Sequence, residues 1–197
     1  MSASTSSNDS HCPCAPVPAI NALSPAKLDP REQHFFIPGP RKGLALFLRR
    51  LSPESQSRSR AVLYVHGATF PSALSIAHRF SGESWRDALC AAGFDVWGLD
   101  FYGFGCSARY PEMQDGAEKH GPFCIAQDAA QQVEIAARFI LAHLGLKALS
   151  IISHSWGSMP VGIFASVHPT LLERWVLFAP IAKRTPLRYE TTPAFPA

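Results

Sequence analysis

The chain has 197 residues, of which 47% are hydrophobic and 17% are charged, enough apolar material for one core, so we expect a single folded domain. Its net charge of +3 is spread along the sequence rather than gathered into a basic stripe, which argues against nucleic acid as a partner. No apolar run approaches the roughly 18 residues of a membrane span, and no apolar stretch follows a basic N-terminus, so neither a membrane anchor nor a secretory signal is expected.

The five cysteines are odd in number and irregularly spaced, at positions 12, 14, 90, 106 and 124. This pattern argues against a disulfide framework and for a reducing compartment, so a cytoplasmic location is expected. His11, Cys12 and Cys14 could contact a metal, but no second ligand pair follows at zinc spacing. We therefore expect neither a metal nor any other cofactor.

The first 28 residues are rich in serine, proline and alanine and show no sustained hydrophobic period. This composition predicts a disordered leader over 1–28, followed by the folded core over 29–180. Two apolar runs open the core, at 34–38 and 43–51, and a Gly-Pro-Arg-Lys turn signal separates them. They predict an antiparallel strand pair.

The next elements alternate between strand and helix. Residues 61–65 are apolar on both faces, as in a central strand of a covered sheet. Residues 84–87 resemble a capping box, and helical spacing follows until Gly93 ends the helix. The run 94–100 predicts a strand, and 125–144 predicts a long helix with one apolar face.

The C-terminal part continues the alternation, with a strand at 148–152, a helix at 156–167 and a strand at 174–180. Strands that alternate with helices are typical of a mostly parallel sheet with helices on both faces. The predicted fold class is therefore α/β, with an antiparallel N-terminal strand pair.

The apolar strand at 148–152 stops abruptly at Ser153-His154-Ser155-Trp156-Gly157, where a helix begins. A serine acts as a nucleophile only where its hydroxyl is exposed, near a base and beside donors for an oxyanion. A sharp strand-to-helix turn exposes it, provided that small residues lie two before and two after it. This S-x-S-x-G pattern puts Ser155 at the nucleophile position, with the N–H of Trp156 as one donor. Chance occurrence, or a Ser155 that merely caps a helix, is the alternative.

Two more motifs follow predicted strand ends. In His66-Gly67-Ala68-Thr69-Phe70 the glycine allows a flexible turn, and the N–H of Ala68 can supply a second donor. The stretch DFYGFGCS at 100–107 lacks a phosphate-binding pattern, so we interpret it as a tight turn packed near the site. Its Asp100 is expected to hold the loop by side-chain to backbone bonds.

The motifs HGATF, DFYGFGCS and SHSWG, in this order and on these elements, resemble those of the α/β-hydrolase family, the broad group of esterases, lipases and related serine hydrolases. The resemblance runs from about Phe35 to Pro180. It implies an α/β-hydrolase fold in which Ser155 is the nucleophile. It also implies that the backbone amides of Ala68 and Trp156 form the oxyanion hole.

In that family the acid and the histidine of the triad follow the nucleophile in the chain. The sequence ends at residue 197, too soon after Ser155 for further strand–helix–strand units of about 30 residues each, so the core is expected to be incomplete. Residues 181–197, with Glu190, are expected to begin a lid or linker. His66 and His154 are expected to bond or pack locally, whereas His120 lies in a loop free enough to move.

The leading functional expectation is hydrolysis of carboxylic esters through an acyl-enzyme on Ser155, with a small-molecule acyl ester as partner. Aromatic residues near the motifs indicate an apolar acyl pocket, in which Phe70 and Phe104 are the expected substrate contacts. Ordinary core packing of these aromatic residues is the alternative.

Fold and nucleophile do not fix the acceptor of the acyl group, so acyl transfer and amide or peptide hydrolysis stay open as alternatives. A third alternative is a truncated, catalytically inactive hydrolase-like protein, because a triad acid and histidine are not evident. A serine without a base is a weak nucleophile at neutral pH. We therefore expect little turnover by this chain.

Overall fold

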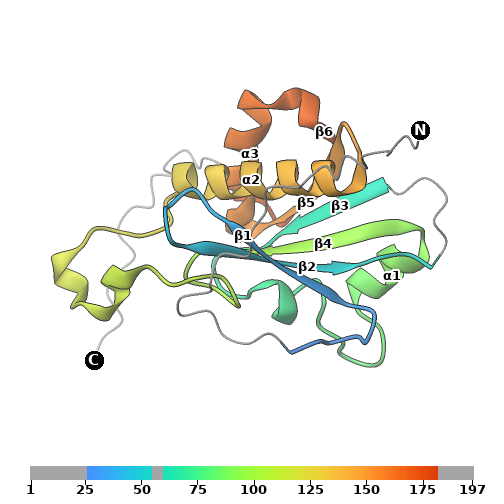
Figure 1. Cartoon of the computed structure of the whole chain (residues 1–197), viewed down its shortest axis with the longest axis horizontal. Helices are drawn as coiled ribbons and strands as arrows, with labels where there is room; N and C mark the ends of the chain where they lie inside the picture. The colour runs from blue at the N-terminus through green and yellow to red at the C-terminus, as the bar shows by residue number, and fades with distance from the viewer. Residues whose placement is uncertain (1–25, 55–59, 182–197) are drawn as a thin grey trace, which may run out of the picture.

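The computed structural model describes residues 26–54 and 60–181, which form one six-stranded sheet with helices on both faces (Figure 1). Most of the expected leader, the His11-Cys12-Pro13-Cys14 stretch and nearly all of 181–197 lie outside the described residues. At the leader boundary, the carbonyl oxygen of Leu28 accepts a hydrogen bond from Arg79 Nη1 at 3.0 Å.

The elements follow the alternation that the sequence predicts. The strands are β1 (Gln33–Pro38), β2 (Ala45–Leu51), β3 (Arg60–Val65), β4 (Phe94–Asp100), β5 (Leu149–His154) and β6 (Leu172–Phe178). The helices are α1 (Trp85–Ala91), α2 (Ala126–Leu144) and α3 (Ser158–Val167). Short 3-10 turns are η1 (Ser72–Leu74), η2 (Pro111–Gln114), η3 (Ala117–Lys119), η4 (Ser155–Gly157) and η5 (Pro169–Leu171).

The strand order is β1-β2-β4-β3-β5-β6. The β1/β2 and β2/β4 pairs are antiparallel, whereas β3/β4, β3/β5 and β5/β6 are parallel. The predicted α/β fold class and the antiparallel opening pair are thereby confirmed. Val65 pairs with Leu99 on one side and with Ser153 on the other, so the carboxyl ends of β3, β4 and β5 meet at one edge of the sheet. Ligand sites of open α/β sheets form at this edge.

Local sequence signals set the helix ends. The Ser84 hydroxyl accepts from the Asp87 N–H and the Asp87 carboxylate accepts from the Ser84 N–H, which is the predicted capping box of α1. Gly93, at φ 87°, follows the helix in the left-handed region that glycine tolerates. The last helix begins at Ser158 rather than at Trp156, because the turn at Ser155 is so sharp that the intervening residues form the tighter η4 turn.

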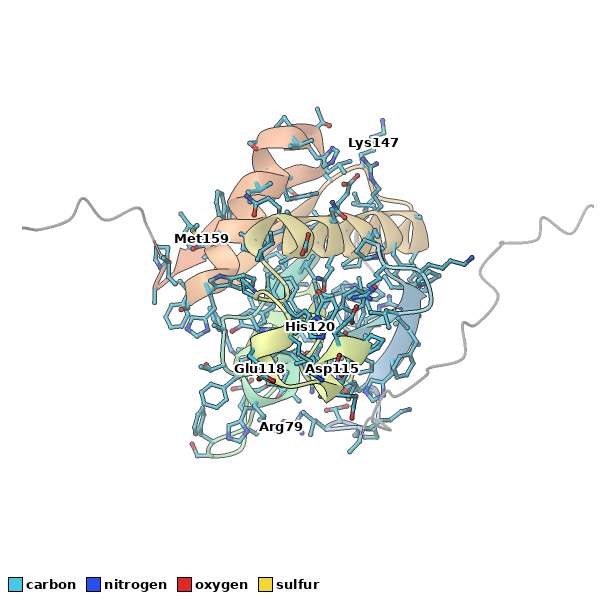
Figure 2. All side chains as sticks on the ribbon, turned by 90° about the vertical axis from the view of Figure 1, so that its left-hand side faces the viewer. Arg79, Asp115, Glu118, His120, Lys147 and Met159 are labelled. Carbon is cyan, nitrogen blue, oxygen red and sulfur yellow. The ribbon has the colours of Figure 1, made fainter. Side chains whose placement is uncertain are left out.

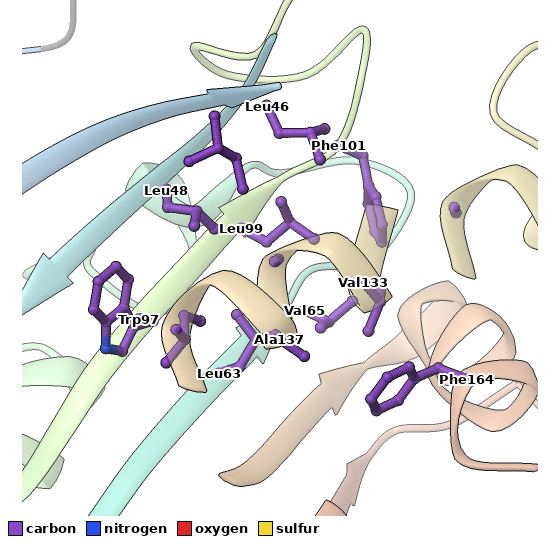
Figure 3. Close-up of a cluster of buried hydrophobic side chains, with 14 of the residues drawn as sticks. Leu46, Leu48, Leu63, Val65, Trp97, Leu99, Phe101, Val133, Ala137 and Phe164 are labelled. Atoms are coloured by element: carbon purple, nitrogen blue, oxygen red, sulfur yellow. The ribbon is translucent and has the colours of Figure 1, made fainter. Parts of the chain in front are cut away.

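The main core lies between the sheet and the helices α2 and α3, which cover one face, while α1 packs on the other (Figure 1). Figure 3 shows Leu63, Val65 and Leu99 of the central strands packed beneath Val133 and Ala137 of α2. Alternate residues of β3 face the other way, toward Ile76 and Ala77, so this strand is buried on both sides as predicted.

Three further observations concern the described residues alone. None of their helices is long and apolar enough to cross a membrane. Cys90, Cys106 and Cys124 are free thiols. No group of three or more histidine, cysteine, aspartate or glutamate residues is arranged to hold a metal ion in residues 26–54 and 60–181.

Candidate active site

Ser155 lies directly after β5 and has a φ of 52°, in the left-handed region that a non-glycine residue rarely adopts. Strained backbone of this kind clusters at functional sites, and at a strand-to-helix turn it lifts the serine side chain clear of the strand. The Ser158 hydroxyl donates to the Ser155 carbonyl oxygen at 2.7 Å and accepts from the Ile181 N–H at 3.1 Å. These bonds hold the serine turn against the first turn of α3 and the residues that follow β6.

The small residues on either side of Ser155 have separate structural reasons. A Cβ on Gly157 would lie 2.5 Å from the carbonyl oxygen of His66 and 2.8 Å from that of Val65, so only glycine lets the turn approach the end of β3. Ser153 is fully buried, and its hydroxyl accepts a hydrogen bond from Trp175 Nε1 at 2.7 Å. The turn is thereby joined to β3 through Gly157 and to β6 through Ser153.

The turn after β3 lies against the nucleophile position. A Cβ built on Gly67 would be 3.1 Å from the Ser155 Cβ and 3.4 Å from the His154 carbonyl oxygen. Standard backbone dimensions then put the Ala68 nitrogen within about 7 Å of the Ser155 Cβ. Two motifs that are far apart in the sequence are therefore adjacent in space, as their shared sheet edge predicts.

His66 is fully buried, and its ring holds this turn in place. Its Nδ1 donates to the Gly67 carbonyl oxygen at 2.6 Å, and its Nε2 accepts from the Phe101 N–H at 3.1 Å. This bonding requires a neutral ring with its proton on Nδ1, and burial lowers the His66 pKa, which favours the same form. Because both nitrogens are engaged, His66 has no free atom to act as a base toward Ser155.

Asp100 holds the DFYGFGCS loop by the expected side-chain to backbone bonds. One carboxylate oxygen accepts from the Ser72 N–H at 2.8 Å and the other from the Cys106 N–H at 3.0 Å. Ser107 closes the same loop, since its hydroxyl donates to the Asp100 carbonyl oxygen and accepts from the Phe47 N–H at 2.8 Å. Gly105 has a φ of 48°, and any side chain there would overlap the Asp100 carboxylate. Asp100 is thus committed to the loop.

A pocket of about 380 Å³ opens where these turns meet. It is lined by Ala68, Phe104, Pro122, Phe123, Cys124, Ile125, Ala126 and Trp156. Three of these are residues that the sequence singled out, namely Ala68, Phe104 and Trp156. The structure therefore brings the two expected oxyanion residues and one expected substrate contact to the same cavity.

The other aromatic residues near the motifs lie elsewhere. Phe70 is 56% exposed and is not among the residues that line this pocket. Phe101 is fully buried, and its ring meets that of Trp156 in a T-shaped arrangement with the ring centroids 5.7 Å apart. The Tyr102 hydroxyl donates to the Leu44 carbonyl oxygen at 3.0 Å. For Phe101 and Tyr102 the alternative of core packing is the better description.

The segment from Pro122 to Ala126 forms one wall of the pocket, and the sequence did not indicate it. Only Ile125 and Ala126 fall within the helix predicted over 125–144, and Pro122, Phe123 and Cys124 carry no pattern that predicts an element. Ile125 is instead the N-cap residue of α2, with extended backbone angles, and Cys124 has a φ of 52°. The sequence signal that could have indicated this wall is a short run of apolar residues directly before the helix.

None of the histidines in the described part of the chain hydrogen-bonds to the Ser155 hydroxyl. His154 is half-buried, and the centroid of its ring lies 5.0 Å from the centroid of the Phe178 ring. His120 Nε2 is 2.7 Å from a carboxylate oxygen of Asp115, and Figure 2 shows both on the loop that leads to α2. Glu190 lies outside the described residues.

A second feature missed by the sequence analysis is a buried ion network beside the site. Glu32 is fully buried and accepts hydrogen bonds from Arg49 and Arg86, which are also buried. Burial raises the Glu32 pKa, but the hydrogen bonds from Arg86 and His34 and the charge of Arg49 lower it below its usual value on balance.

Arg49 links this network to the DFYGFGCS loop through Ser72. Arg49 Nε donates to the Ser72 hydroxyl at 2.9 Å, and the Ser72 N–H donates to Asp100. The region before β1 is thereby linked to the DFYGFGCS loop. Glu32 is separated in the chain from Arg49 by 17 residues and from Arg86 by 54 residues, which is why no local pattern revealed these ion pairs.

The geometry defines a hydrolase fold with a strained serine turn at the carboxyl edge of a mostly parallel sheet. A family model for the alpha/beta hydrolase fold matches residues 60–195. The chain therefore belongs to the α/β-hydrolase family. A search of curated protein sequences gave no significant match.

Solved structures similar to this one perform several different reactions. An epoxide hydrolase from Vigna radiata is 15% identical with a TM-score of 0.58, and the match covers 79% of this chain and 41% of the epoxide hydrolase chain. A thioesterase domain from the curacin biosynthetic pathway is 18% identical with a TM-score of 0.57, and the match covers 78% of this chain and 49% of that domain's chain. A predicted CIB-like hydrolase from Thermoplasma acidophilum is 23% identical with a TM-score of 0.54, and the match covers 76% of this chain and 63% of the hydrolase. These likenesses concern the fold, and the chain spans less than two thirds of each structure.

Proposed function

We propose that this chain carries the nucleophile and the oxyanion donors of a serine hydrolase that acts on carboxylic esters. The observation that carries the proposal is the left-handed backbone of Ser155 at the end of β5, against the Gly67 turn. The apolar pocket at this junction supports an apolar acyl substrate, since Ala68 and Trp156 both line it.

In the proposed reaction, Ser155 Oγ attacks the ester carbonyl carbon, and the carbonyl oxygen becomes an oxyanion. The N–H groups of Ala68 and Trp156 donate to that oxyanion, and the adjacent start of α3 favours negative charge there. The C–O bond to the alcohol then breaks and the alcohol leaves with a proton. Water attacks the resulting acyl-enzyme, which releases the acid and restores the Ser155 hydroxyl.

The attack requires an acceptor for the Ser155 proton. His66 is neutral with both ring nitrogens bonded, and His120 pairs with Asp115. For this chain we therefore propose slow turnover, sustained by the oxyanion donors and by substrate binding. Such sites keep roughly 10³- to 10⁴-fold acceleration over water after triad residues are removed.

The same observation favours a second candidate, a hydrolase-like protein that binds acyl ligands without turning them over. Acyl transfer and amide or peptide hydrolysis are further variants of the Ser155 chemistry, because the family hosts many reactions. Comparing turnover of an ester with turnover of the matching anilide separates ester from amide hydrolysis.

The proposal is tested by labelling the 197-residue protein with a fluorophosphonate and locating the adduct by peptide mass spectrometry. Ser155 Oγ forms a bond to phosphorus, the P–F bond breaks, and fluoride and a proton enter solution. We expect slow labelling confined to Ser155, lost in Ser155→Ala. Ser166→Ala is the matched control, since that hydroxyl bonds only within α3, to Ile163. An adduct on other serines, or a folded protein that is never labelled, would refute Ser155 as the nucleophile.

A further inference from the structure

We propose that the pocket lined by Phe104, Phe123 and Ile125 is an acyl-chain site that selects uncharged, straight-chain acyl groups of about eight carbons. This inference rests on the proposed function, because it places in this pocket the acyl chain of a substrate that Ser155 attacks; Trp156, the residue next to Ser155, lines the pocket. It assigns specificity to Phe123 and Ile125, at the entry to α2, in addition to Phe104.

The chemistry of the lining excludes charged substrates. All eight lining residues are uncharged, and seven of them are apolar or aromatic, with Cys124 as the eighth. A charged group buried there would lose its water and gain no partner. The neighbouring pocket of about 330 Å³ is different, since Arg41 and Asp128 line it. The segment Pro122–Cys124 belongs to both linings and therefore divides an apolar cavity from a polar one.

The size of the cavity sets the chain length. At about 30 Å³ for each water-sized group, a volume of about 380 Å³ holds roughly a dozen heavy atoms. An acyl chain of about eight carbons, with its carbonyl oxygen, fits within that space. Longer chains would extend past the partly exposed Phe123 and Ile125 into solvent and would gain little more.

The pocket wall at Phe123 and Cys124 is attached to neighbouring elements by side-chain contacts. Gln132 donates to the Cys124 sulfur at 3.5 Å and accepts from the Tyr102 N–H at 2.9 Å, which ties the wall to the DFYGFGCS loop. The Phe123 ring stacks on the Tyr110 ring, with the two ring centroids 5.2 Å apart. Phe123 and Ile125 nevertheless remain 37% and 43% exposed. Two large apolar side chains held in place at the rim of an apolar cavity are suited to contact a ligand.

The experiment compares labelling of Ser155 by three fluorophosphonates, whose substituents are ethyl, octyl and an eight-carbon chain ending in a carboxylate. Each fully buried methylene contributes up to about four-fold in binding. We expect the octyl probe to label at least about ten-fold faster than the ethyl probe. The carboxylate-ended probe should lose most of that gain.

Two variants test the wall. Phe123→Ser and Ile125→Ser should each lower the octyl-to-ethyl rate ratio by about three-fold or more. Ile125→Ser is well suited, because serine is a preferred N-cap residue and Ile125 occupies the N-cap of α2. The matched control is Phe80→Ser, at a phenylalanine that is 89% exposed and does not line the pocket. It should leave the ratio unchanged.

The outcomes separate this inference from the proposed function. Equal labelling of Ser155 by the octyl and ethyl probes, or a ratio unaffected by both wall variants, overturns the acyl-chain site and leaves Ser155 as the nucleophile. A failure of every probe to label Ser155 overturns both.

Discussion

The two sides of the serine turn are built in different ways. Toward β3 and β4 the polar groups are buried and satisfied, as His66 and Asp100 bond to backbone atoms of neighbouring loops. Toward β6 the apolar side chains Val176, Leu177 and Phe178 are each about half exposed. The buried side holds the turns that carry the expected oxyanion donors, whereas the exposed side joins the serine turn through the β5/β6 pairing, the Ser153–Trp175 hydrogen bond and the Ser158–Ile181 hydrogen bond.

The surface below the sheet shows the same difference. A groove of about 180 Å³ is lined by residues of β3 and β6, and of these Val62 of β3 is 3% exposed whereas Val176 of β6 is 49% exposed. Buried, hydrogen-bonded groups are therefore concentrated on the β3 side of Ser155, and we expect that side to contribute more to stability. Substitutions on the two sides should therefore differ sharply in effect.

The largest effect is expected for Glu32→Gln, which leaves two buried arginines without their shared carboxylate. Removing one partner from a buried ion pair typically costs about 3–5 kcal/mol of unfolding free energy. Urea unfolding measures the change. Glu54→Gln is the control, because Glu54 is 87% exposed in its pair with Arg31 and its loss should leave the midpoint unchanged. Equal midpoints for both variants would show that the network contributes no stability.

Gly157→Ala comes next, because its methyl group would meet the backbone oxygens of Val65 and His66. Overpacking of this kind costs typically 1–3 kcal/mol, and we expect about 3 kcal/mol since both neighbours are backbone atoms. In Gly162→Ala the new methyl would make ordinary contact with Trp175 at 3.5 Å, and the helix should gain up to about 1 kcal/mol. If the two variants unfold at the same urea concentration, the close approach at Gly157 is wrong.

A smaller effect is expected from pH. Because burial lowers the His66 pKa below its ordinary value of 6.5, the unfolded chain binds a proton at higher pH than the folded one. Stability should therefore fall as the pH drops below 6.5, by up to about 1.4 kcal/mol per pH unit. Urea midpoints at pH 7.5 and 5.5 measure this in the wild type and in His66→Gln. His143→Gln serves for comparison, since burial also lowers the His143 pKa. An unchanged pH dependence in His66→Gln would exclude His66 as its source.

The smallest effect on stability is expected on the exposed side. Val176→Lys should change the unfolding free energy by less than about 0.5 kcal/mol, because this side chain is 49% exposed. A lysine on an exposed sheet edge also opposes strand pairing between molecules, so light scattering at high concentration should decrease. A loss of several kcal/mol would mean that the β6 side is as tightly packed as the other.

The sequence predicted the features that depend on neighbouring residues. The capping box of Ser84 and Asp87 and the buried pattern of β3 were confirmed, and the loop bonds of Asp100 were found as expected. The Glu32 network and the pocket wall at Pro122–Ala126 were not predicted. Both arise from contacts between distant segments, which no local periodicity encodes.

The most direct test of the account is the pH dependence of Ser155 labelling by a fluorophosphonate between pH 5.5 and 9. The account predicts that the serine turn and its donors are formed without a base at the hydroxyl. The labelling rate should then rise about ten-fold per pH unit, in step with hydroxide, with no plateau near neutrality. Fast labelling that reaches a plateau above pH 7, and loses it in His120→Gln or His154→Gln, would show an operating histidine base and contradict the account.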